Sequence, residues 1–186
     1  MTWLKSVVSG RWLAAGVAAL TVTALLAPTV ASAAPRSGLS YLNEFETFKE
    51  RDLWKTYKGD AAGVIGASAD NPRSGRVHGR MVAMAGYQQY SLRYGLAVPQ
   101  YARCAAQIWG TLTGDGHTAF IVRDTAGTFL SGATFRRTVQ PTYQRYVVDG
   151  FYLPADRVLN FTVTLKGSGP SYSTTDIDDF ALQCTW

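Results

Sequence analysis

The alternation of apolar and polar residues predicts a chain built almost entirely from β-strands. Beyond residue 40 the sequence carries no sustained 3.6-residue helical stripe, whereas Gly, Thr, Val and aromatic residues abound. Turn-forming Gly, Asn, Asp and Pro separate the apolar segments. About ten short strands at this spacing favour a single antiparallel sandwich or barrel. We expect strands near 42–48, 54–58, 63–68, 76–85, 88–98, 102–112, 117–124, 128–135, 144–152, 157–166 and 177–185, with a turn at 167–170.

The first thirty-odd residues follow a different pattern. Lys5 and Arg11 accompany an uncharged apolar run over 12–27, and Ala31–Ala33 has the small residues of a cleavage site. The run is shorter than the ~20 residues that a membrane-spanning helix needs, so a signal peptide is favoured over a membrane anchor. We expect no membrane segment after cleavage and a secreted, extracellular protein. The expected parts are a signal peptide (1–33), a short linker (34–40) and one domain (41–186).

Composition and charge limit the classes of partner that the chain is expected to bind. Because Lys5 and Arg11 leave with the leader, the formal net charge of +5 falls to +3 in the mature chain. The remaining cations are scattered, so no basic stripe for nucleic acid is present in the sequence. Nothing in the sequence calls for an organic cofactor, and we expect a monomer.

Strand parity places both cysteines of the predicted mature chain on core-facing sides. Cys104 alternates in phase with apolar residues of the 102–112 strand, and Cys184 does so in the last strand. In an oxidising compartment, two cysteines favour one disulfide over two buried thiols. A bond between Cys104 and Cys184 would contribute roughly 3–4 kcal/mol in the chain-entropy model.

The last strand begins with two adjacent carboxylates. Asp178 has the parity of the core residues Phe180 and Leu182, so its carboxylate starts a buried row and needs compensation. A calcium ion would supply it, since calcium takes carboxylate and carbonyl oxygens. Hydrogen bonds from loop amides, or solvent at the strand end, are the alternatives.

Five motifs in a fixed order carry a family resemblance. They are Asn43–Glu46, Trp54, Ser74–Gly75, Tyr143 with Tyr146, and Ile177–Leu182. In this order the chain resembles the carbohydrate-binding modules that accompany bacterial cellulases and xylanases. The resemblance implies an all-β, antiparallel jelly-roll β-sandwich of the galactose-binding-like superfamily. It also implies a structural calcium between the first and last strands, with Asp178 and Glu46 among its ligands.

A sugar site needs a flat aromatic face and directional polar groups. On the outward side of the 102–112 strand, parity places Arg103, Gln107 and Trp109. Gln89 and Arg93 lie on the preceding strand and would sit beside them if sequential strands pair. We expect these five residues to bind a polysaccharide or other glycan, although a loop or terminal segment covering Trp109 is the alternative.

Catalytic patterns are sparse. The two histidines, His78 and His117, belong to no HExxH or GxSxG motif, and no pair of cysteines has metal-ligand spacing. The sequence therefore predicts a secreted, non-catalytic carbohydrate-binding protein. A structural or partner-binding sandwich without a sugar site is the alternative, and a small polysaccharide-degrading enzyme is a third candidate.

Overall fold

The computed structural model describes residues 37–59, 63–92 and 95–186, which belong to one compact unit. The predicted leader and Arg93 lie outside these residues. Among the residues that are described, no helix has both the length and the apolar character needed to cross a membrane.

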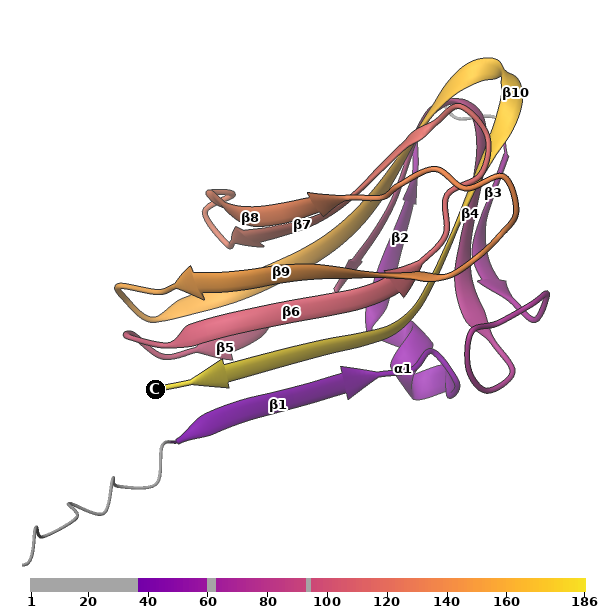
Figure 1. The fold of residues 1–186 in the computed structure, drawn as a ribbon. Helices are drawn as coiled ribbons and strands as arrows, with labels where there is room; N and C mark the ends of the chain where they lie inside the picture. Colours follow the sequence, from indigo (N-terminus) through magenta and orange to yellow (C-terminus); the bar gives the residue numbers. More distant parts are fainter. Residues whose placement is uncertain (1–36, 60–62, 93–94) are drawn as a thin grey trace, which may run out of the picture. The chain divides into compact units, whose positions relative to one another are not determined.

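Antiparallel strands make up nearly all of this unit, as the sequence predicts (Figure 1). The elements are β1 (Gly38–Asn43), α1 (Phe48–Asp52), β2 (Trp54–Lys58), β3 (Gly63–Ser68), β4 (His78–Leu92), β5 (Leu96–Val98), β6 (Arg103–Gly110), β7 (His117–Asp124), β8 (Phe129–Thr134), β9 (Gln144–Tyr152) and β10 (Arg157–Thr185).

The strands form a two-layered sandwich in which β10 serves both layers. The first part of β10 pairs with β7 and β4, which in turn pair with β8 and β2. Its last part pairs with β1 and β6, and β6 pairs with β9. In Figure 1, β10 runs out along one layer, bends, and returns along the other. We call β8, β7, β4 and β2 with the first part of β10 the first layer, and β1, β6 and β9 with its last part the second layer.

The turn predicted at 167–170 is a bulge inside β10. Pairing with β4 resumes after it, because Ser168 lies opposite Ala85 and Ser173 opposite Ala83. Four residues of β10 therefore bulge out against Met84 alone. The prediction of two strands, 157–166 and 177–185, is wrong here, since the Gly and Pro residues that signal a turn also occur at bulges.

Two further strand predictions also differ from the structure. The segment 42–48 ends as a strand at Asn43 and continues into helix α1, whose N-cap is Thr47. A capping box fixes this start: Glu50 N donates to Thr47 Oγ1 at 3.1 Å, and Thr47 N donates to Glu50 Oε2 at 2.8 Å. The segment 88–98 divides into β4 and β5, with Gly95 in the left-handed region at φ 64°.

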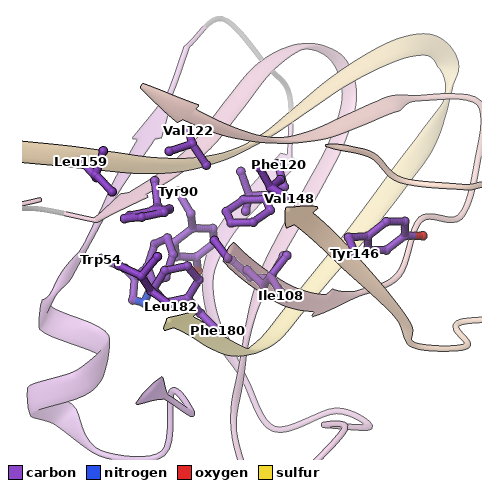
Figure 2. Close-up of a cluster of buried hydrophobic side chains, with 14 of the residues drawn as sticks. Trp54, Tyr90, Ile108, Phe120, Val122, Tyr146, Val148, Leu159, Phe180 and Leu182 are labelled. Atoms are coloured by element: carbon purple, nitrogen blue, oxygen red, sulfur yellow. The ribbon is translucent and has the colours of Figure 1, made fainter. Parts of the chain in front are cut away.

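Aromatic side chains from both layers fill the core (Figure 2). The ring of Phe161 in the first layer lies 5.0 Å from that of Phe180 in the second, centroid to centroid. Phe120 stacks on Phe161 at 6.3 Å, and Trp54 meets Phe180 edge-on at 5.5 Å. All four side chains are buried, so they hold the layers together by removing apolar area from water.

The predicted disulfide is present. Cys104 of β6 and Cys184 of β10 are paired residues on neighbouring strands, with Cα atoms 4.1 Å apart. Both side chains are buried on the core side of the second layer, where strand parity placed them. The bond ties the last strand to a residue 80 positions earlier.

Removal of this bond should destabilise the domain. Replacing both Cys104 and Cys184 by Ala should lower the free energy of unfolding in urea by roughly 3–4 kcal/mol, because the unfolded chain loses a long cross-link. A reductant should destabilise the native chain and leave the double variant unaffected. Equal urea midpoints for the two proteins would contradict the prediction.

Candidate functional site

The outward face of the second layer carries a groove. Two neighbouring cavities of about 560 and 400 Å³ lie on it and share residues of β1, β10, β6 and β9. The half-buried Ala105 and Ala181 form its floor. Its polar residues are Gln107, Arg145, Asp149 and Gln183. We call the surface made by these six residues the groove.

The shape of the groove follows from side-chain size. β6 and β10 are the central strands of the layer, and at Ala105 and Ala181 each of them presents only a methyl group outward. The flanking strands carry larger exposed side chains, Leu42 on β1 and Val147 on β9. A low floor between higher walls produces an open trough that can accept an extended ligand.

Strand parity placed two predicted ligand residues correctly on this face. Gln107 lines the groove, and Arg103 lines the larger of the two cavities. Their role in binding stays a prediction. Gln89 lies elsewhere, because β4 pairs with β10, β2 and β3 rather than with β6, so the expected adjacency is wrong. Gln89 accepts a hydrogen bond from the hydroxyl of Tyr87 at 2.6 Å, through its Oε1.

Trp109 lies on the same strand and is partly covered. The guanidinium of Arg73 lies 3.9 Å from the centroid of its indole ring, which is a cation–π contact. Arg73 belongs to the 69–77 segment between β3 and β4, and it also forms an ion pair with Asp179. The alternative of a loop over Trp109 is therefore realised on one face of the ring.

Asp178 is fully buried and is compensated by amides. Its Oδ2 accepts from the backbone N–H of Arg73 at 3.0 Å and of Ser74 at 3.3 Å, and its Oδ1 accepts from that of Asp179 at 2.9 Å. Burial, together with the neighbouring Asp179 carboxylate, still raises the pKa of Asp178 to about 6. Hydrogen bonds from loop amides, the alternative that the sequence left open, thus hold this carboxylate.

The 69–77 segment also binds the carboxylate of Glu46. Its carboxylate accepts from the backbone N–H of Arg76 at 2.9 Å and of Val77 at 3.2 Å. Gly75 is in the left-handed region at φ 56°, and a Cβ atom there would lie only 2.1 Å from Glu46 Oε1. The Ser74–Gly75 motif is therefore needed for the close approach of this segment to the carboxylate.

These residues do not fit a calcium ion as they stand. In the part of the chain that the structure describes, no three acidic, His or Cys side chains gather closely enough to hold a metal. The oxygens of Asp178 and Glu46 already accept N–H groups, whereas calcium needs six to eight oxygen ligands.

Calcium at Asp178 and Glu46 stays a prediction, and it can be checked directly. If calcium binds there, protein that has been treated with a chelator and then soaked in calcium should contain one equivalent of calcium. Metal analysis that finds no stoichiometric calcium would remove it.

A second buried polar cluster lies beside this segment. Arg80 Nε donates to Asp176 Oδ1 at 2.7 Å, and Nη1 of Arg80 donates to Asp70 at 2.9 Å. Nε2 of the fully buried His78 lies 3.1 Å from Asp176 Oδ1, although neither ring nitrogen is aligned for a hydrogen bond with a described residue. The hydroxyl of Tyr143 is buried there too, and burial, with the nearby Asp176 charge, raises its pKa.

Sequence reasoning missed this cluster. His78 belongs to no catalytic motif in the sequence, yet it is fully buried, and Asp176 falls in the segment predicted as a connection between two strands. Along β4 the buried residues Gly79, Met81 and Ala83 alternate, and His78 is out of phase with them, so strand alternation does not predict its burial. The cluster connects β4 to β10, because Arg80 and Asp176 are paired residues on these two strands.

Solved carbohydrate-binding modules share this fold. TmCBM61 in complex with β-1,4-galactotriose is 15% identical in sequence, with a TM-score of 0.53 over 71% of this chain and 88% of that one. A structure described as that of a CBM4 is 17% identical, with a TM-score of 0.51 over 73% and 98%. The CBM22-1 xylan-binding domain of Xyn10C from Paenibacillus barcinonensis is 15% identical, with a TM-score of 0.53 over 80% and 96%.

The chain has the fold of a carbohydrate-binding module. These neighbours, each covered over most of its own length, are binding modules, and the resemblance read from the sequence motifs is confirmed at the level of fold. No family model matches the chain, and no curated protein matches it in sequence.

The Asp176 cluster should make stability depend on pH. Burial alone would raise the pKa of Asp176, but its contacts with His78 and Arg80 hold that pKa below the ordinary value. A lowered pKa contributes stability above the unfolded pKa and loses it as the pH falls through the folded one. Asp176→Asn should cost about 2–3 kcal/mol at pH 7, less than a fully broken buried pair because Asp70 still faces Arg80.

Urea denaturation across pH measures this effect. The difference between the native chain and Asp176→Asn should begin to shrink below about pH 4, where Asp176 of the unfolded chain takes up a proton, and should continue to shrink as the pH falls toward the lowered pKa of the folded chain. A difference that stays constant from pH 7 to pH 3 would mean that the ionised Asp176 contributes nothing.

Proposed function

We propose that this chain is an exported, non-catalytic protein that binds polysaccharide in the groove. The observation that carries the proposal is the trough on the outward face of the second layer, with a methyl floor and polar residues along it. The finer placement of the sandwich, as a jelly roll of the galactose-binding-like superfamily, belongs to the same proposal. The predicted leader and the disulfide support export, since disulfides persist in oxidising compartments.

The chemistry of the groove suits sugar rings. Gln107 and Gln183 each offer an amide donor and an acceptor to hydroxyl groups, and Arg145 offers further donors. The methyl groups of Ala105 and Ala181 let a ring approach the sheet closely with its C–H face. Trp109 flanks the groove, since its paired residue on β9 is Arg145. Two of the structural neighbours are described with a galactotriose and as a xylan-binding domain, which supports a polysaccharide as the ligand class.

A partner-binding sandwich without a sugar site is the second candidate. The contact of Arg73 with Trp109 favours it, because an aromatic face already occupied by a guanidinium is less available to a sugar. Retention on insoluble cellulose, xylan, chitin and cell-wall glycans separates the two candidates. Release of reducing sugar from the same polymers tests for an enzyme.

Filling the floor of the groove should weaken retention. Ala181→Leu adds bulk where a sugar ring would lie, so affinity for the retained polysaccharide should fall by about tenfold or more, as overfilling a fitted surface costs about 1–3 kcal/mol. Ala119→Leu, on the outward side of β7 in the first layer, is the matched control and should leave retention unchanged.

The free energies of unfolding of Ala181→Leu and Ala119→Leu should lie within about 0.5 kcal/mol of that of the native chain, since neither residue faces the core. Equal retention by the native chain and Ala181→Leu, measured by depletion from solution, would place the sugar site outside the groove.

A further inference from the structure

The groove continues into a cavity at the far end of β6. This end cavity, of about 400 Å³, is lined by Tyr101, Arg103, Thr185 and Trp186. Arg103 and Thr185 also line the larger cavity of the groove, so the two spaces adjoin. From Trp109 to Arg103 the strand advances six residues, or about 20 Å at 3.4 Å per residue. An extended chain lying in the groove would therefore reach the end cavity.

Arg103 lines this cavity, and no described residue gives its guanidinium an anionic partner. Its side chain is exposed and makes no hydrogen bond or ion pair with any residue that the structure describes. Arg73 and Arg80, by contrast, are paired: Arg73 with Asp179, and Arg80 with Asp70 and Asp176. A guanidinium presents a planar fork of N–H donors that matches a carboxylate in two parallel hydrogen bonds.

Exposed aromatic residues line the same cavity as Arg103 or lie on the neighbouring strand. Tyr101 is 62% exposed and Trp186 is 41% exposed, and both line the end cavity. Tyr152, which is 49% exposed, is the residue paired with Arg103 on β9 and so shares its outward face. Large apolar rings exposed to water near a guanidinium offer a sugar ring both a stacking face and a charge.

The backbone holds Tyr101 in this position. Its φ is 64°, in the left-handed region that residues other than Gly rarely adopt. Two hydrogen bonds fix the turn: Tyr101 N donates to Leu153 O at 2.6 Å, and Leu153 N donates to Ala102 O at 3.0 Å. Such conformations persist where the surrounding structure imposes them, and they concentrate at ligand sites.

From these features we infer that the polysaccharide is acidic and that the end cavity binds a carboxylate-bearing sugar unit through Arg103. The inference rests on the proposed function and names its ligand class. The sugar ring stacks on Tyr101 or Trp186, and its carboxylate accepts two hydrogen bonds from the Arg103 guanidinium. Because the site is open to water, this pairing provides selectivity for acidic over neutral sugar units more than overall affinity.

The other charges of the groove agree with this arrangement. Arg145 also makes no hydrogen bond or ion pair within the described residues, and it lies at the Trp109 end. Asp149 lies on β9 between Arg145 and Tyr152, which is the residue paired with Arg103, and its carboxylate would repel that of an acidic sugar. Acidic units should therefore sit at the two ends of the groove, with a neutral unit donating its hydroxyl groups to Asp149 between them.

The test compares acidic polymers with their carboxyl-reduced forms. Polygalacturonate, alginate and glucuronoxylan are each used as such and after reduction of the carboxyl groups to hydroxymethyl groups, by affinity electrophoresis with the full chain. At least one acidic polymer should be bound about tenfold more tightly than its reduced form, as expected for charge-assisted hydrogen bonds. Arg103→Gln should lower this ratio by about threefold or more, with Arg145 accounting for what remains, and Arg103→Lys should lose less.

The control is Lys55→Gln, which removes the same charge from exposed β2 in the first layer. It should leave the ratio unchanged, and all variants should melt within a few degrees of the native chain. An equal loss in Lys55→Gln and Arg103→Gln would show unspecific attraction and overturn the inference. Binding of acidic and reduced polymers alike overturns it while leaving the groove as a glycan site.

Two further outcomes are also decisive. A phosphorylated mannan presents the guanidinium with another anion of similar geometry; if only this polymer is retained, the carboxylate assignment is overturned. If no acidic, reduced or neutral polymer is retained, the proposed function fails and this inference fails with it.

Discussion

The passage of β10 through both layers is the constraint on which the rest of the structure depends. One continuous strand pairs with β7 and β4 in the first layer and with β1 and β6 in the second. Its buried peptide groups have to remain hydrogen-bonded along this course, because an unpaired buried N–H or C=O costs about as much as a lost hydrogen bond. β10 solves the problem with two irregularities, one between Ser168 and Ser173 and one between Asp178 and Ala181.

The second irregularity shapes the surroundings of the groove. Asp178 pairs with Trp109 and Ala181 with Gln107, so two residues of β10 oppose one of β6, and Asp179 takes a positive φ of 46°. Both carboxylates thereby point toward the segment between β3 and β4, where they bind its amides, a hydroxyl and the Arg73 guanidinium. The position of Arg73 over Trp109 is thus a consequence of how β10 enters the second layer.

Strand parity explains what the sequence could and could not predict. Alternation alone placed Cys104 and Cys184 in the core and Arg103 and Gln107 outward, because most of β6 and the end of β10 are regular. It failed where the alternation is interrupted: a bulge in β10 hid the continuity of the strand, and a capping box at Thr47 starts a helix at the end of a predicted strand. Gln89 was misplaced for another reason, since which strands are neighbours depends on long-range pairing that a local pattern does not encode.

The same parity separates binding from stability in the second layer. Along β6, residues 104, 106 and 108 are buried in the core, while 103, 105 and 107 face the groove. Substitutions of residues that face the groove therefore leave the packing of Phe161 against Phe180 unaltered. Trp109 is the exception, because Arg73 connects it to the buried Asp179. The side chains at the Arg103 end can therefore change at little cost in stability, whereas the Trp109 end depends on the course of β10.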